Sequence, residues 1–408
     1  MKALMFYIFL FYLIALASCQ QDGKGNLVLI NDAKSAKCLD GSPIGFYFFQ
    51  GFGEGQDKFL IYLQGGGLCQ GETNEELLEQ CYQRSKTTLG SSKKWAKTAQ
   101  NSGNLSNNQQ SNPAFYNWNK IYVQYCDGYL YQGSASIPYK NTTLHFKGYD
   151  NMVEIFNYLI QNYSIQSSKM IVLSGGSAGG LGAFYWNQYL RKIINSNVII
   201  IAAPDSGFFV DIPGNDNSQK YKQIDLLTNG NRSILQPEGC PYLQQNDLVY
   251  KCSQPQYIID QMPVPVFIIN SLYDSYTLKY ILQINCITPT YGLQNCSNQD
   301  IQKVELLRNL TFTQLQEIQT KKPNWGIWAI SCLYHVFSES ITTYSGPKYE
   351  VPMNSDFTVS HVLNQFIQQQ LSGQSQNNFY IDQVVYPNNQ NCNGLSSFYN
   401  KYIYNQQI

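Results

Sequence analysis

Charged side chains are scarce in this chain of 408 residues. Lys, Arg, Asp and Glu make up 13 % of it, about half the usual share, and the formal net charge is +0. No basic patch or run is present, so nucleic acids and other polyanions are not expected partners. Beyond residue 19 no apolar run is long enough to cross a membrane, so we expect no integral membrane segment.

Histidine is also rare, and the 11 cysteines do not form the paired C-x-x-C spacing of zinc knuckles. We therefore expect neither a structural zinc site nor any other metal or organic cofactor. With only three histidines, the candidates for a histidine base are limited to His145, His335 and His361.

The N-terminal residues 1–19 have the pattern of a secretory signal peptide. Lys2 precedes an apolar run, and small residues offer cleavage after Ala17 or Cys19. Residues 16–19 also resemble a bacterial lipobox, which would acylate Cys19. Six N-x-S/T sequons favour a eukaryotic secreted protein instead: Asn104, Asn141, Asn162, Asn231, Asn295 and Asn309. We expect a location outside the cell or in the lumen of secretory vesicles.

The cysteine count agrees with a secreted protein. Removal of Cys19 would leave 10 cysteines, enough for up to five disulfides. Sequence alone does not fix the pairing, but local pairs such as Cys240 with Cys252 and Cys286 with Cys296 are reasonable predictions.

The most informative stretch runs from Met170 to Gly180. Residues 170–173 form a short apolar run typical of a buried strand, and residues 181–194 have the apolar spacing of a helix. Between them, Gly175, Ser177 and Gly179 form a G-x-S-x-G motif, the arrangement of a nucleophile elbow. The turn is so tight that a Cβ at either flanking glycine would collide with backbone. The alternative is an ordinary Gly/Ser-rich loop.

Strands and helices alternate along the chain. Expected strands cover 27–30, 46–49, 59–63, 120–125, 170–173, 198–202, 265–270 and 326–330; expected helices cover 148–163, 181–194, 304–320 and 358–371. This alternation indicates a doubly wound α/β sheet. Together with the elbow motif, it leads us to expect an α/β-hydrolase-like fold: a mostly parallel sheet flanked by helices, with cap or loop excursions and disulfides. Residues 211–260 are expected to form a cap. We expect one domain over 20–408, with a Gln/Asn-rich tail over 372–408.

A glycine run follows the expected strand 59–63. Residues 65–67 are all glycine and are followed by Leu68, so backbone N–H groups are left uncovered at a strand end. In esterases such a run supplies an oxyanion hole. A flexible turn is an equally good interpretation of the run by itself.

A serine hydrolase also needs a base and an acid that orients it. Of the three histidines, His335 follows the expected strand 326–330, at the edge where this fold places its base, whereas His145 precedes a helix and His361 lies within one. Asp274 follows the strand 265–270, although a lone Asp there more often caps a helix. The order Ser177, Asp274, His335 is the α/β-hydrolase order.

These residues stand in blocks that resemble the pectin acetylesterase/Notum family of secreted carboxylesterases. The matching blocks are Leu63–Cys69 (LQGGGLC), Tyr125–Gly128 (YCDG), Gly175–Gly179 (GGSAG), Asp205–Phe209 (DSGFF), Tyr273–Tyr276 (YDSY) and Ser331–His335 (SCLYH). They span most of the mature chain in the family's order. The resemblance therefore implies an α/β-hydrolase fold and serine esterase activity without a cofactor.

By this resemblance Ser177 is the nucleophile, Asp274 the orienting acid and His335 the base. The oxyanion donors are the N–H groups of Gly67, Leu68 and Ala178, each typically worth ~3 kcal/mol in the barrier. The base takes the serine proton as the serine attacks an ester carbonyl, and water then clears the acyl-enzyme.

Other positions bear on the substrate or the scaffold. Asp127 and Asp205 match family positions and are expected to be structural or to line the pocket. The family usually has Trp where this chain has Leu68, and often has Trp at the position of Tyr276, so the pocket is expected to differ in shape.

Three functions remain open at this point. The first is removal of acyl groups, O-acetyl foremost, from a polysaccharide such as pectin. The second is a Notum-like removal of a fatty acyl group from a secreted protein. The third is an inactive protein of this fold that serves in binding or adhesion, although such proteins usually lose a catalytic residue or the glycine run. The expected partner is an acylated polysaccharide or protein, and we expect a monomer.

Overall fold

The computed structural model describes residues 23–212, 219–228, 237–245, 247–288, 292–374 and 376–389. The expected signal peptide lies outside these ranges, as do Asn231 and Cys392. None of the helices within them combines the length and hydrophobicity needed to cross a membrane.

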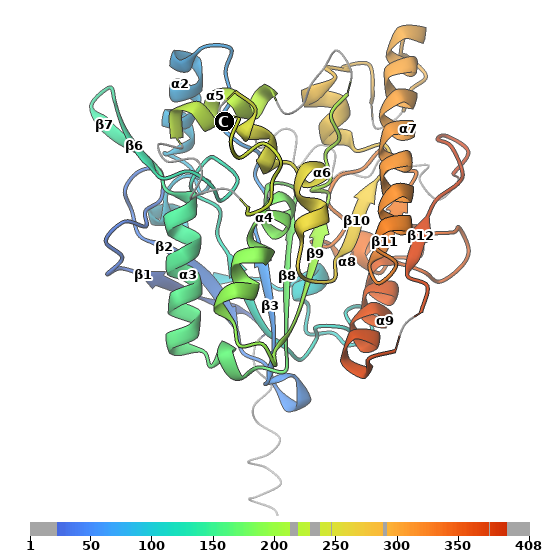
Figure 1. Ribbon diagram of the computed structural model, residues 1–408, viewed down its shortest axis with the longest axis horizontal. Helices are drawn as coiled ribbons and strands as arrows, with labels where there is room; N and C mark the ends of the chain where they lie inside the picture. The colour runs from blue at the N-terminus through green and yellow to red at the C-terminus, as the bar shows by residue number, and fades with distance from the viewer. Residues whose placement is uncertain are drawn as a thin grey trace, which may run out of the picture.

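A single sheet of ten strands organises the fold (Figure 1). In spatial order its strands are β12 (Phe379–Ile381), β11 (Gly326–Ile330), β10 (Phe267–Ser271), β9 (Ile199–Asp205), β8 (Met170–Gly176), β3 (Lys58–Leu63), β5 (Asn119–Val123), β2 (Ile44–Phe49), β1 (Gly25–Ile30) and β4 (Thr98–Ala99). Strands β12 to β5 run parallel, and β2, β1 and β4 continue the sheet in antiparallel pairs. The predicted mostly parallel sheet is confirmed.

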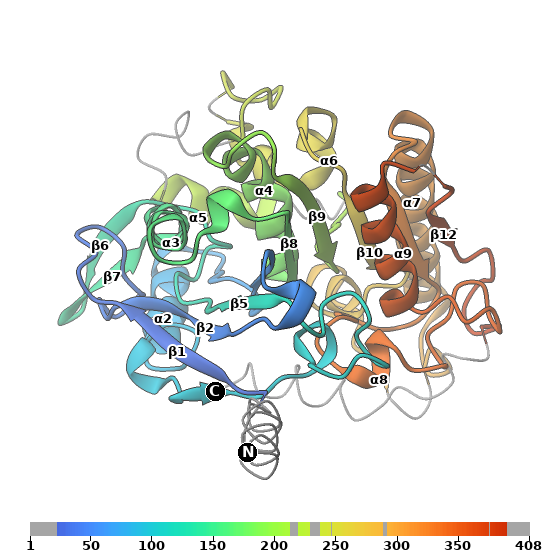
Figure 2. The same cartoon turned by 90° about the horizontal axis from the view of Figure 1, so that it is seen from below.

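Helices connect and cover these strands. They are α2 (Asn74–Arg84), α3 (Gly148–Asn162), α4 (Ala178–Ile193), α5 (Gln219–Thr228), α6 (Pro255–Ile258), α7 (Asn298–Lys321), α8 (Ile341–Tyr344) and α9 (Val359–Ser372). A separate antiparallel ribbon of β6 (Ala135–Tyr139) and β7 (Thr142–Phe146) lies at the opposite end of the molecule from α9 (Figure 2). The expected cap region, residues 211–260, contains the short helices α5 and α6.

The central strand shows how the sequence builds two cores. All seven residues of β8 are buried, and alternate residues point to opposite faces of the sheet. Ile171 and Leu173 join the core that includes side chains of α3, α4 and α7. Met170 and Val172 join the core on the other face, which includes α8 and α9. A continuous apolar run is what a strand buried on both faces requires.

Four disulfides join described cysteines: Cys38–Cys126, Cys69–Cys81, Cys240–Cys252 and Cys286–Cys296. The two predicted local pairs are confirmed. Disulfides on this scale are typical of proteins that fold in an oxidising compartment.

One expectation requires correction. The region after Ser372 is not only a tail, because residues 379–381 form the edge strand β12, parallel to β11. The strand itself is Phe-Tyr-Ile, flanked by polar residues, and all three of its residues are partly exposed, as fits an edge position. Among the sequons, Asn104 is 1 % exposed and its N–H donates to Ser338 O at 2.8 Å. A glycan therefore has no room there, whereas Asn141, Asn162, Asn295 and Asn309 are exposed.

Candidate active site

Ser177 lies in the sharp turn between β8 and α4, at the upper end of the sheet in Figure 1. Its φ of 56° and ψ of −117° belong to a region that non-glycine residues rarely adopt. The neighbouring glycines make this turn possible: a Cβ on Gly175 would overlap the backbone of Gly179, and one on Gly179 would overlap Leu63 O. This is the geometry expected of a nucleophile elbow.

Asp274 and His335 meet at the same edge of the sheet. Asp274 follows β10 and His335 follows β11, and the distance from His335 Nδ1 to Asp274 Oδ2 is 2.5 Å. The other carboxylate oxygen, Oδ1, accepts hydrogen bonds from the N–H and the hydroxyl of Thr277 at 2.8 and 2.9 Å. Both oxygens of Asp274 are thereby oriented, with one directed to the imidazole.

Aromatic rings and carboxylates surround His335. Its ring stacks on Tyr276 with centroids 5.4 Å apart, and Phe209 lies 6.2 Å away. Burial by itself lowers the pKa of His335, but the charge and hydrogen bond of Asp274, followed by the charges of Asp205 and Glu339, raise it above its usual value. The site therefore stabilises the imidazolium form.

The elbow and the His335 loop are in contact. A Cβ on Gly176, which precedes Ser177, would lie 2.8 Å from a methyl group of Val336, which follows His335. The side chain of His335 is 14 % exposed and Ser177 is 8 % exposed. The structure thus brings all three predicted catalytic residues to one edge.

The glycine run lies against the elbow. A Cβ on Gly65 would be 2.8 Å from Gly176 O and 3.2 Å from Ser177 Cβ. Gly66 and Gly67 have φ of 155° and 65°, which only glycine adopts without strain. Ala178 begins the 16-residue helix α4, where first-turn N–H groups have no partner within the helix. The start of the glycine run and the start of α4 therefore both lie at Ser177.

Side chains hold the glycine run in place. Arg84 Nη2 donates to Gly66 O at 2.7 Å, and the Tyr125 hydroxyl donates to Gly67 O at 2.7 Å. In a trans peptide the N–H points opposite to the C=O. Fixing these carbonyls therefore directs the N–H groups of Gly67 and Leu68 the other way. The Cys69–Cys81 disulfide links this run to α2, which carries Arg84.

The other histidines stand apart from this cluster. His145 is in β7 and shares a hydrogen bond with Ser136, while His361 is in α9 and pairs with Gln365. Asp127 is buried and accepts the N–H groups of Tyr129 and Tyr131, which is the structural role predicted for it. Burial raises the pKa of Asp127 to about 7.

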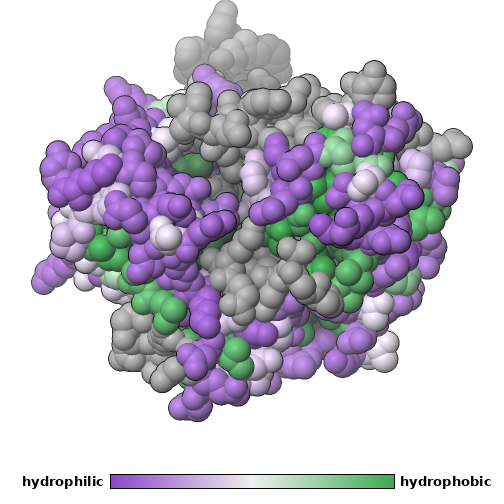
Figure 3. Space-filling model, turned by 90° about the horizontal axis from the view of Figure 1, so that it is seen from above, coloured by the Kyte–Doolittle hydropathy of each residue, from purple (hydrophilic) through white to green (hydrophobic). Residues whose placement is uncertain are grey.

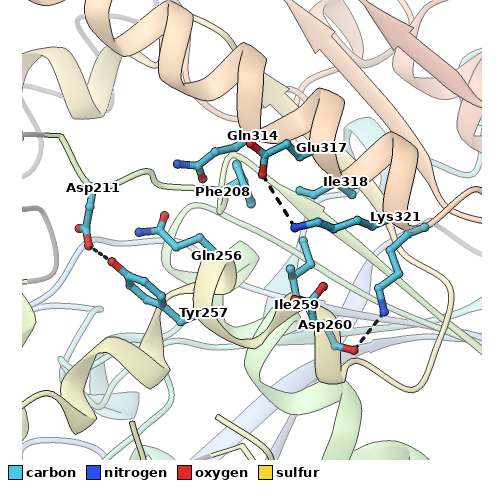
Figure 4. Close-up of a pocket in the computed structure, with 11 residues that line it drawn as sticks. Phe208, Asp211, Gln256, Tyr257, Ile259, Asp260, Gln314, Glu317, Ile318 and Lys321 are labelled. Atoms are coloured by element: carbon cyan, nitrogen blue, oxygen red, sulfur yellow. Dashed lines mark hydrogen bonds and ion pairs between the residues drawn. The ribbon is translucent and has the colours of Figure 1, made fainter. Parts of the chain in front are cut away.

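A cavity of about 400 Å³ lies between α6 and α7, and Phe208 forms part of its lining (Figure 4). Part of its polar lining is paired: the Tyr257 hydroxyl donates to Asp211, and Lys321 pairs with Glu317. Among the described residues, the side-chain oxygens of Gln256 and Gln314 are buried without a hydrogen-bond partner. Neither Ser177 nor His335 lines this cavity. Seen from above, the described surface is mostly hydrophilic (Figure 3), although charged residues are few in the chain.

Two residues that shape this site were not predicted from the sequence. Arg84 lies in α2, a helix that was not predicted either. Its capping box at Thr73 and Glu76 was the available signal. Ser206 lies in a quoted block but received no role, although it directly follows a strand that ends beside the elbow strand.

Comparisons with known proteins identify relatives of this chain. A family model described as Pectinacetylesterase matches residues 18–393. Pectin acetylesterase 11 of Arabidopsis thaliana is 30 % identical over 326 residues, covering 78 % of this chain and 80 % of the relative. Palmitoleoyl-protein carboxylesterase NOTUM of Schmidtea mediterranea is 27 % identical over 319 residues, covering 74 % of this chain and 56 % of the relative.

NOTUM of Homo sapiens is 26 % identical over 254 residues, 59 % of this chain and 49 % of its own length. The similarity to pectin acetylesterases thus extends over more of both chains than the similarity to this NOTUM does. With the family model covering nearly the whole chain, the protein belongs to the pectinacetylesterase family of carboxylic ester hydrolases.

Proposed function

We propose that this protein is a secreted serine carboxylesterase that removes O-acetyl groups from a polysaccharide such as pectin. The observation that carries the catalytic part is the 2.5 Å contact between Asp274 and His335, beside the strained elbow of Ser177. The polysaccharide part rests on the relatives named pectin acetylesterase, of which this chain spans 80 %. The four disulfides support a secretory-pathway location.

In the proposed mechanism His335 takes the proton of Ser177 as the serine oxygen attacks the acetyl carbonyl. Asp274 holds the imidazole through Nδ1, which leaves Nε2 to act on the serine. Backbone N–H groups of Gly67, Leu68 and Ala178 stabilise the oxyanion. The sugar hydroxyl leaves with the proton from His335, and water attacks the acetyl-enzyme by the same route in reverse.

A second candidate function is removal of a fatty acyl group from a secreted protein. It is favoured by the relatives named palmitoleoyl-protein carboxylesterase and by the rings of Tyr276 and Phe209 beside His335, which give the site an apolar wall. We propose acetyl removal first because this chain matches 74–80 % of the length of the pectin acetylesterases but 48–56 % of that of the NOTUM proteins. The monomeric state remains a prediction, to be checked by light scattering.

The test is hydrolysis of p-nitrophenyl esters from acetate to palmitate, by the secreted protein and by Ser177→Ala. We expect activity that depends on Ser177 and is greatest on acetate, together with acetate release from acetylated pectin. A maximum at long chains would replace the first candidate by the second. Hydrolysis by Ser177→Ala at the wild-type rate would overturn the proposed nucleophile. No activity on any ester would favour a binding protein.

A further inference from the structure

A second buried aspartate lies between the two halves of the site. Asp205 is the last residue of β9, the strand between β8 and β10, and it is fully buried. Its Oδ2 accepts hydrogen bonds from Phe337 N, Ser338 N and Ser338 Oγ, each at 2.7 Å. Its Oδ1 accepts the hydroxyl of Ser206 at 2.9 Å. One carboxylate therefore holds the turn that follows His335.

The main chain of Asp205 contacts the elbow that carries Ser177. Its carbonyl oxygen accepts the N–H of Ser177 at 2.9 Å. Backbone and side chain of one residue thus connect the elbow of Ser177 to residues 337 and 338. The separation between nucleophile and base is thereby set through a short chain of hydrogen bonds.

The turn after His335 needs such support because its backbone is strained. Val336 has φ of 65°, a value that is exceptional for a β-branched residue. Its N–H donates to Ser206 Oγ at 2.9 Å, and Ser206 itself has φ of 50°. Strained residues of this kind persist only where their surroundings fix them. Ser206 and Asp205 provide that fixation.

The charge of Asp205 also bears on the site. Burial raises the pKa of its carboxyl group, and the four hydrogen bonds donated to it oppose that rise by stabilising the ionised form. The groups that act on His335 are the carboxylates of Asp274, Asp205 and Glu339, the first by direct contact. The rings of Tyr276 and Phe209 flank the imidazole. Asp205 therefore adds to the field that stabilises a protonated His335.

We propose that Asp205 is a positioning residue that fixes His335 relative to Ser177 and supplies a second negative charge that favours the imidazolium formed during proton transfer. This inference rests on the proposed function, in which His335 is the base. It assigns to Asp205 a role in the reaction beyond that of a scaffold residue.

Asp205→Asn separates charge from shape. The amide oxygen of Asn can accept the three donors of residues 337 and 338, and the amide nitrogen can donate to Ser206 Oγ, so the turn is preserved while the charge is lost. We expect kcat to fall about tenfold with KM unchanged, and the acid limb of kcat/KM to move down by roughly one pH unit.

Ser206→Ala makes the complementary change. It removes the acceptor for Val336 N–H and leaves the charge of Asp205 in place, so kcat should fall several-fold while the acid limb stays put. Asp382→Asn is the matched control: Asp382 is 4 % exposed and accepts the N–H of Ser331 and the amide of Asn389. It should cost stability but leave both kcat and the acid limb unchanged.

NMR titration of the histidine Cε1–H signals gives a readout apart from activity. With three histidines, His145→Gln and His361→Gln assign the His335 signal. In Asp205→Asn the His335 midpoint should fall by roughly one pH unit, and in Asp382→Asn it should not move.

The outcomes separate this inference from the proposed function. If the wild-type protein shows no activity that depends on Ser177, the proposed function is overturned. The NMR titration of His335 would still test the effect of the Asp205 charge. Active Asp205→Asn with an unmoved His335 midpoint and kcat within twofold of wild type overturns the inference. If Asp205→Asn does not fold, Ser206→Ala decides: a lowered kcat at constant KM supports positioning by this pair, and an unchanged kcat overturns it.

Discussion

The nucleophile side and the base side of the candidate site achieve close approach by opposite means. Around Ser177 the close contacts are made by removing side chains, since Gly175, Gly179 and Gly65 each stand where a Cβ would meet backbone or Ser177 itself. Around His335 the turn is held by other side chains. Val336 keeps its branched Cβ at a φ of 65°, so the strained turn needs external support. There, Ser206 and Asp205 supply hydrogen-bond acceptors.

The difference explains how each side responds to change. In a turn made of glycines, a substitution adds a Cβ that overlaps backbone atoms, and only movement of the backbone can relieve that overlap. A turn held by acceptors fails through unsatisfied buried N–H groups, each costing ~1–3 kcal/mol. The first kind of fault should unfold the region, whereas the second should leave a folded protein with misplaced catalytic groups. The following expectations test that contrast.

The largest effect is expected for Gly179→Ala. Its Cβ would overlap the carbonyl oxygen of Leu63, so we expect destabilisation of at least ~3 kcal/mol and little secreted protein. Gly53→Ala is the control, because Gly53 has φ of 55° but open space around it, and should cost only ~1–2 kcal/mol. Thermal unfolding measures both. Equal losses would show that overlap is not what the elbow avoids.

The next effect concerns pH on the base side. His335 must be neutral to take a proton, and its raised pKa keeps it protonated to higher pH than usual. Activity should therefore be lost as pH falls through a midpoint above about 6.5, tenfold for each further pH unit. The measurement is kcat/KM on p-nitrophenyl acetate from pH 4 to 9. A midpoint below about 6.5 would contradict the field described for this side.

A smaller effect is expected for Tyr125→Phe on the nucleophile side. The change removes the donor to Gly67 O and the acceptor for Leu130 N–H, so the Leu68 N–H loses its fixed direction. We expect kcat to fall about fivefold at constant KM. Tyr131→Phe is the control, because that hydroxyl binds Gln64 O, outside the predicted donors. If the control loses as much kcat, the orientation argument fails.

The smallest effect is expected for Thr277→Val. The change keeps the shape of the side chain but removes the hydroxyl bond to Asp274 Oδ1, while the N–H of residue 277 still binds the same oxygen. We expect kcat to fall about threefold, with melting temperature lowered slightly. Steady-state kinetics on p-nitrophenyl acetate measures it. A loss of a hundredfold would mean that the base side depends on single contacts as steeply as the elbow does.

The same contrast decides how much could be predicted from sequence. The elbow and the glycine run were predictable because their constraint is local and selects glycine, which is visible as a motif. The strands and the order Ser177, Asp274, His335 were predictable because apolar runs mark strand ends, and parallel strands bring those ends to one edge. The ten-stranded, mostly parallel sheet confirms the predicted fold class.

The support of the base side could not be predicted in the same way. Nothing in the sequence around Val336 indicates its positive φ, because Ser206, which accepts its N–H, is 130 residues away in sequence. Arg84 reaches Gly66 from a helix with few apolar residues, of which Leu77 and Cys81 are buried. The edge strand β12 was hidden by its polar neighbours. Each of these depends on tertiary contacts that no short window of sequence contains.

The Cys69–Cys81 disulfide closes the segment that directly follows the glycine run 65–67. Three consecutive glycines can adopt many backbone conformations in the unfolded chain, so fixing them costs more conformational entropy than fixing other residues. The disulfide adjoins this run and spans 12 residues, and a loop of that size removes ~3 kcal/mol of chain entropy from the unfolded state. The disulfide therefore reduces the entropy cost of the segment next to the run, whereas the three glycines themselves must be ordered by their own hydrogen bonds with Arg84 and Tyr125.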